Sequence, residues 1–140
     1  MKSDIEIAKF VYHKIKGTEL ERNVSGKLSD RGRPNKSYKE DIVISVLANE
    51  GCGQIQRAYV NVNIYVKDLW NSETKTWEKD SIRICELCEL SKFLFAIRKD
   101  EYHTVPSQCS QKTDSTGVSF EDGHTEHFIN NKLYIEINNE

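Results

Sequence analysis

The chain has 140 residues and a mass of 16.2 kDa, which is the usual size of one globular domain. With 37% hydrophobic and 30% charged residues, only 2 prolines and only 7 glycines, the composition excludes long disorder and low complexity. The formal charge of −2 and the lack of a long apolar run give no reason to expect a membrane span or a strongly basic surface. Acidic residues interrupt the N-terminal stretch where a signal peptide needs an apolar run, so we expect an intracellular product.

The first expected element is a helix over residues 3–16. Ser3 and Glu6 match a capping box, and Gly17 is placed to end the helix. The apolar residues between them follow helical spacing: Ile7, Ala8, Val11, Tyr12 and Ile15. Residues 17–40 are polar and locally basic, and we expect a solvated loop there.

Two strands are expected next, over residues 41–47 and 59–66. The second gives the clearest pattern in the chain, because β-branched residues at 60, 62, 64 and 66 alternate with asparagines and tyrosines. The first strand is rich in Ile and Val, and residues 48–57 contain Gly51 and Gly53. This pattern predicts an antiparallel hairpin with a long turn.

The second half of the sequence predicts one long helix and two strands. Residues 68–79 read as a polar connection whose Trp70 and Trp77 either cap the core edge or anchor an interface. A helix is expected over 80–98, an edge strand containing Pro106 over 102–109, a loop over 110–124 and a last strand over 126–137.

This order predicts a single α+β domain over residues 1–140. The expected order is helix, strand, strand, helix, strand, strand, and the short connections favour antiparallel pairing. We therefore expect two layers: a mostly antiparallel four-stranded sheet with one face covered by two helices. The helices are expected on the face that carries the apolar residues at 60–66.

The four cysteines and four histidines raise the question of a metal site. Cys85 and Cys88 form a C-x-x-C, and with His124 and His127 they would supply the ligand types of a zinc site. The pair lies within a helical apolar pattern, which favours small buried thiols. No nucleophile elbow, phosphate-binding loop or dinucleotide fingerprint is present. We expect no enzyme activity, cofactor or metal, and keep a small zinc-binding or hydrolytic protein as the alternative.

Two sets of residues are candidates for contact with a partner. Arg31 and Arg33 lie in the basic stretch and are suited to phosphate or to an acidic partner surface, although a solvated loop also explains them. Asn61, Asn63 and Tyr65 share the polar face of the second strand, and such a face suits a wet, specific protein contact.

The middle of the chain resembles a known group of phage proteins. The matching segments are Arg33-Pro34, EDIVI at 40–44, GQIQR at 53–57 and VNVNIYVKDL at 60–69. They resemble small proteins encoded in tail gene clusters of phages and prophages of Bacteroides-type gut bacteria. The order of elements is also similar to that of tail-terminator (tail-completion, or neck) proteins of long-tailed phages.

This resemblance implies a structural role without catalytic residues or cofactors. Tail terminators assemble as rings, commonly hexamers, that end the tail tube and join it to the head connector. The expected partners are thus other copies of the chain, the tail tube and the connector, with non-specific passage of DNA and no membrane. The expected location is the virion tail or neck, and the bacterial cytoplasm during assembly. In this setting Arg31 and Arg33 would line the channel or grip the tube.

Overall fold

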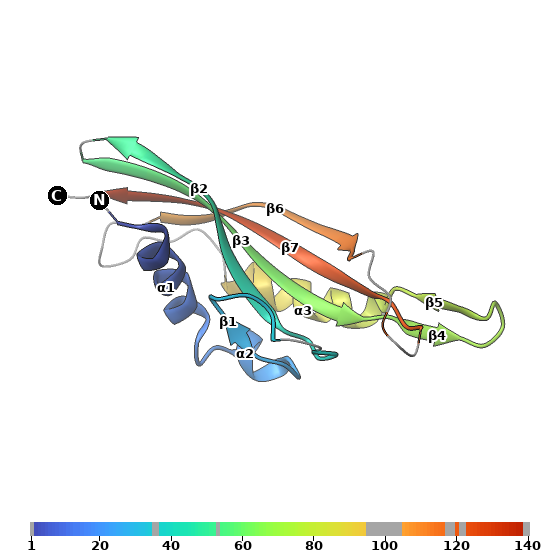
Figure 1. Ribbon diagram of the computed structural model, residues 1–140. Helices are drawn as coiled ribbons and strands as arrows, with labels where there is room; N and C mark the ends of the chain where they lie inside the picture. The colour runs from blue at the N-terminus through green and yellow to red at the C-terminus, as the bar shows by residue number, and fades with distance from the viewer. Residues whose placement is uncertain are drawn as a thin grey trace.

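The computed structural model describes residues 2–34, 37–52, 54–94, 105–116, 120 and 123–138. A twisted five-stranded sheet forms the body, and a two-stranded hairpin projects from the end opposite the chain termini (Figure 1). The elements in chain order are α1 (Asp4–Ile15), α2 (Glu19–Asn23), β1 (Leu28–Ser29), β2 (Ile42–Cys52), β3 (Ile55–Lys67), β4 (Leu69–Asn71), β5 (Thr76–Glu78), α3 (Ser81–Leu94), β6 (Val105–Ser115) and β7 (Glu126–Asn138).

The sheet has the order β1-β2-β3-β7-β6, and its core lies on one face. Alternate residues of β3, from Ala58 to Val66, are buried on that face, opposite the buried residues of β7. Helix α1 contributes a buried stripe that includes Ile7 and Val11, and α3 contributes Ile84 and Leu87. The expected packing of helices on the apolar face of residues 60–66 is therefore present.

Helix α1 begins as the sequence predicts. The Ser3 hydroxyl accepts from the backbone N–H of Glu6, and the Glu6 carboxylate accepts from the backbone N–H of Ser3. These two bonds satisfy backbone donors that the first turn leaves unpaired. None of the helices among the described residues is long and apolar enough to cross a membrane.

The prediction of a four-stranded sheet is wrong, because the sheet has five strands. The predicted chain order of helix, strand, strand, helix, strand, strand is wrong as well. Residues 17–40 contain α2 and β1, and β1 pairs with β2 in parallel, which adds a fifth strand. Such a two-residue strand leaves no periodic pattern in the sequence, because its position depends on tertiary contacts. The α+β class and the mostly antiparallel pairing are confirmed.

Three boundaries also differ from expectation. The long turn after residue 47 is wrong, because β2 continues to Cys52 and β3 begins at Ile55. The polar connection at 68–79 contains the β4–β5 hairpin, in which Trp70 pairs directly with Trp77. The expected loop from 110 is wrong at its start, since β6 extends to Ser115. The expected ends of the long helix (95–98) and of the edge strand (102–104) lie outside the described residues.

Candidate functional site

The five candidate contact residues fall on two surfaces. Asn61, Asn63 and Tyr65 lie on the sheet face opposite the helices, where all three are half-buried. Arg33 folds back onto the same face, and its guanidinium carbon lies 4.2 Å from the centre of the Tyr65 ring. Arg31 is exposed and lines a groove beside β2. The structure therefore brings four of the five together and leaves Arg31 apart.

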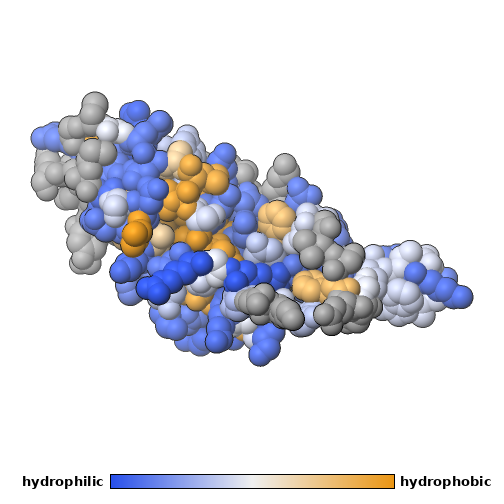
Figure 2. Space-filling model, viewed as in Figure 1, coloured by the Kyte–Doolittle hydropathy of each residue, from blue (hydrophilic) through white to orange (hydrophobic). Residues whose placement is uncertain are grey.

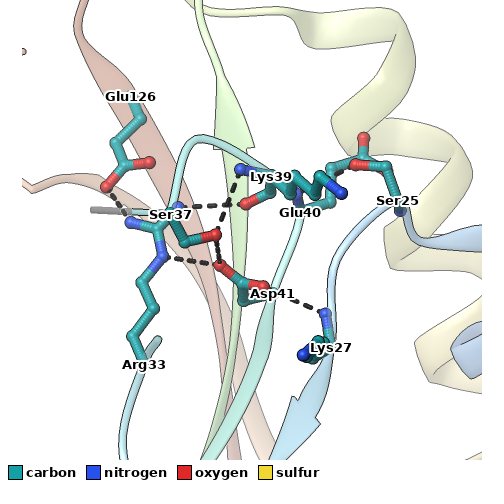
Figure 3. A network of polar contacts seen from close by, with 8 residues as sticks. All are labelled: Ser25, Lys27, Arg33, Ser37, Lys39, Glu40, Asp41 and Glu126. Atoms are coloured by element: carbon teal, nitrogen blue, oxygen red, sulfur yellow. Dashed lines mark hydrogen bonds and ion pairs between the residues drawn. The ribbon is translucent and has the colours of Figure 1, made fainter. Parts of the chain in front are cut away.

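Arg33 is the centre of a polar network that fastens the loop after β1 to the sheet (Figure 3). Its Nε donates to Asp41 Oδ2 at 2.9 Å, a terminal nitrogen donates to Glu126, and the other donates to the carbonyl of Lys39 at 3.0 Å. The side chains of Asp41 and Glu126 are 1% and 5% exposed. Because each guanidinium nitrogen has an internal acceptor, the main role of Arg33 in this chain is to hold the loop in place.

The network also sets the charge state of Asp41. Burial raises the pKa of its carboxyl, but hydrogen bonds from the Ser37 hydroxyl, from Arg33 and from the Lys27 backbone N–H outweigh burial and lower it overall. Burial lowers the pKa of Arg33, and the bonds to Glu126 and Asp41 more than reverse this effect. Both side chains are therefore held in their charged forms.

The neighbouring acid, Glu40, anchors the same segment to α3. Arg83 donates to both Glu40 oxygens, at 2.7 and 2.8 Å, and this fork raises the pKa of Arg83. Ser25 and Glu40 exchange further bonds, because the Glu40 N–H donates to the Ser25 hydroxyl and the Glu40 carboxylate accepts from the Ser25 N–H. The adjacent acids Glu40 and Asp41 thus bind different partners: Glu40 pairs with Arg83 of α3, and Asp41 pairs with Arg33 of the loop after β1. These contacts fix the segment before β2 from both sides.

The remainder of the open face is polar but well packed. The Asn130 amide donates to Asn63 Oδ1 at 2.7 Å, and the rings of Tyr59 and Tyr134 lie 5.3 Å apart. The carboxamide oxygen of Asn61 is buried without a hydrogen-bond partner among the described residues. An unpaired buried acceptor is costly, so this oxygen lowers the stability of the face.

Both edges of the sheet are open in the described part of the chain. On the outer side of β2, β1 covers only Ile42 and Val43, and no described strand pairs with the rest. An open groove of about 650 Å³ follows this edge, between α1 and residues 30–32. Figure 2 shows apolar side chains gathered between α1 and β2; the exposed fractions of Ile5 and Leu47 are 69% and 54%. At the other edge, β7 is the only described strand that pairs with β6.

The cysteines and histidines proposed as zinc ligands lie in separate surroundings. Cys85 is exposed and Cys88 is half-buried on α3, where burial, and then the nearby Cys85, raise the pKa of the Cys88 thiol. The His124 ring stacks on Phe120 at 4.2 Å, and His127 Nδ1 lies 2.6 Å from Asp68 Oδ1. Among the described residues, no group of three or more His, Cys, Asp or Glu side chains is arranged to hold a metal ion.

Sequence reasoning missed the partners of Arg33 and His127. Glu126 lies 93 positions from Arg33, and Asp68 lies 59 positions from His127, so no local pattern joins them. The available signal in the sequence was the position of the two carboxylates: Asp68 directly follows β3, and Glu126 is the first residue of β7. In comparisons with models of known protein families and with curated proteins, no family and no curated protein matches this chain.

Proposed function

We propose that this chain is a structural protein of a phage or prophage tail, whose copies form a ring at the tail end. The ring would terminate the tail tube and join it to the head connector, without catalysis or a cofactor. The observation that supports this proposal best is the pair of open sheet edges, β2 and β6, on opposite sides of one domain.

The directions of the two edge strands suit repeated association. Every pairing from β2 through β3 and β7 to β6 is antiparallel, so β6 runs opposite to β2. A neighbour in the same orientation can therefore place its β6 antiparallel to the β2 of the first copy. Such a contact joins two different surfaces, and it closes into a ring when the rotation between copies is a whole fraction of a turn.

Two exposed apolar side chains at or near the β2 edge favour a protein partner over water. Ile5 of α1 lines the groove, and Leu47 of β2 follows directly after its lining residue Val46; both side chains are large, apolar and mostly exposed. Natural proteins usually protect an exposed edge strand with charge or proline, because an open edge pairs with other chains. At Leu47 this edge carries an apolar residue where protection would call for a charge.

The polar face and the groove beside β2 then have defined roles in the proposed ring. The open face, with Asn61 and Asn63 at its centre, would meet the tail tube or the connector. The exposed guanidinium of Arg31 beside the groove is the one suited to an acidic partner or to passing DNA, since Arg33 bonds internally.

Deleting the gene from its phage tests the tail role separately from self-association. We expect tails of irregular length without attached heads, and restoration of normal particles by the wild-type gene. Tails of normal length with heads attached in the deletion strain would overturn the proposal. The alternative of a zinc-binding or hydrolytic protein has no supporting metal cluster among the described residues.

A further inference from the structure

A recess lies at the base of the β4–β5 hairpin, apart from both sheet edges. It has a volume of about 510 Å³. Aromatic and acidic side chains dominate its walls; the lining residues of these two kinds are Tyr38, Trp70, Trp77, Glu40, Asp68 and Asp80. Among the described residues, Lys67 is the only basic one that lines it.

The aromatic side chains are held in place by neighbouring rings, yet part of their surface remains exposed to solvent. Trp70 and Trp77 lie directly opposite each other across the hairpin, with ring centres 5.3 Å apart, and Trp77 also contacts His124. This edge-to-face pair stabilises the hairpin. Even so, 52% of Trp70 and 44% of Tyr38 remain exposed. Large aromatic surfaces that are both fixed and exposed are typical anchors for a partner.

The charges around these rings favour a positively charged group. Three carboxylates and one ammonium line the recess, which gives a formal charge of −2 from Glu40, Asp68, Asp80 and Lys67. Glu40 is already paired with Arg83, and both Asp68 oxygens are bonded, to Thr125 and His127. Asp80 accepts one bond, from the Arg83 N–H, and a carboxylate has about four acceptor sites. Asp80 therefore has capacity for another donor.

We propose that this recess binds an arginine side chain presented by an extended segment of a partner protein. A guanidinium is planar, so it stacks on an indole or phenol face while its N–H groups reach a carboxylate. The recess offers both kinds of group within one cavity. The inference does not depend on ring formation, because none of the described residues that line the recess belongs to β2 or β6.

The test is a titration of the full chain with the peptide acetyl-Gly-Arg-Gly-amide, followed by indole fluorescence and by the two indole N–H signals in NMR. The control peptide carries citrulline, which has nearly the same shape as arginine but no charge. We expect saturable shifts of both indole signals at millimolar peptide and at least about tenfold weaker binding of the citrulline peptide. Equal binding of the two peptides, or no shift with either, would overturn the proposal.

Two variants from different elements localise the binding. Trp70→Leu and Tyr38→Leu should each weaken the arginine peptide about fivefold or more, while Ile82→Leu, at an exposed position of α3 outside the recess, should leave it unchanged. Because Trp70 also supports the hairpin, Tyr38→Leu gives a second reading that does not depend on β4 and β5. Unchanged binding in both variants would contradict the assignment. A third outcome would also overturn the proposal: if the peptide does not bind, and Trp70→Leu abolishes self-association of the protein, then the recess binds a second copy of the chain.

Discussion

At the scale of single residues, Arg33 is the cation that pairs with two almost fully buried carboxylates, Asp41 and Glu126. Replacing it by methionine leaves the buried carboxylates of Asp41 and Glu126 without their cation, so the free energy of unfolding should fall by about 3 kcal/mol. Urea unfolding at neutral pH measures this change. The control is Arg31→Met, at an exposed position, which should shift stability by less than about 0.5 kcal/mol. Equal losses in the two variants would mean that the network contributes nothing.

The same network predicts a pH dependence. The pKa of Asp41 is lower in the folded than in the unfolded chain, so its stabilisation is complete above about pH 4 and is lost as the pH falls through the folded-state pKa. The stability difference between wild type and Arg33→Met should therefore shrink as the pH falls below about 4. Urea titrations across this range measure it. A difference that stays constant throughout would contradict the assigned charge states.

At the scale of elements, Gly26 lies very close to the segment before β2. A Cβ at Gly26 would lie 2.3 Å from Asp41 Oδ1 and 2.5 Å from the carbonyl oxygen of Glu40. Gly26→Ala should therefore lower the free energy of unfolding by about 1–3 kcal/mol and loosen both ion-pair networks. Thermal unfolding gives the stability, and NMR of the Arg33 and Arg83 side chains shows the loosening. An alanine variant as stable as wild type would show that the two segments separate easily.

The elements also show how far the sequence could predict the fold. The alternation in β3 and the capping box of α1 were readable, because each is a local pattern with one physical cause. The hairpin at Trp70 and Trp77 was not, since strands of three residues are too short to show a periodic pattern, and the cross-strand indole contact appears only in the folded structure. Asn131 interrupts the apolar pattern of β7, yet it is buried and donates to Ser91 on α3. A buried polar pair of this kind is visible only once both elements are in place.

The candidate site was predictable in composition but not in arrangement. The polar face of β3 followed from its period, and the structure has it opposite the helices. The internal ion pairing of Arg33 could not be predicted, because its partner on β7, Glu126, lies 93 positions away in the sequence. The open β2 edge depends on β1 being only two residues long, which is a consequence of tertiary packing.

At the scale of the whole molecule, the β2 edge should control association. Leu47 of β2 is 54% exposed, and a lysine there protects an edge strand without touching the core. Leu47→Lys should weaken association at least about tenfold. Ile82→Lys places the same charge on an exposed position of α3 and should associate as wild type does. Equal weakening by both lysines would point to non-specific charge repulsion.

The most direct test of edge-to-edge assembly is the molar mass of the purified protein by sedimentation equilibrium over a range of concentrations. We predict masses that rise toward a fixed multiple of 16.2 kDa in the wild type and stay near 16.2 kDa in Leu47→Lys. A wild-type chain that remains at 16.2 kDa at every concentration would contradict the account.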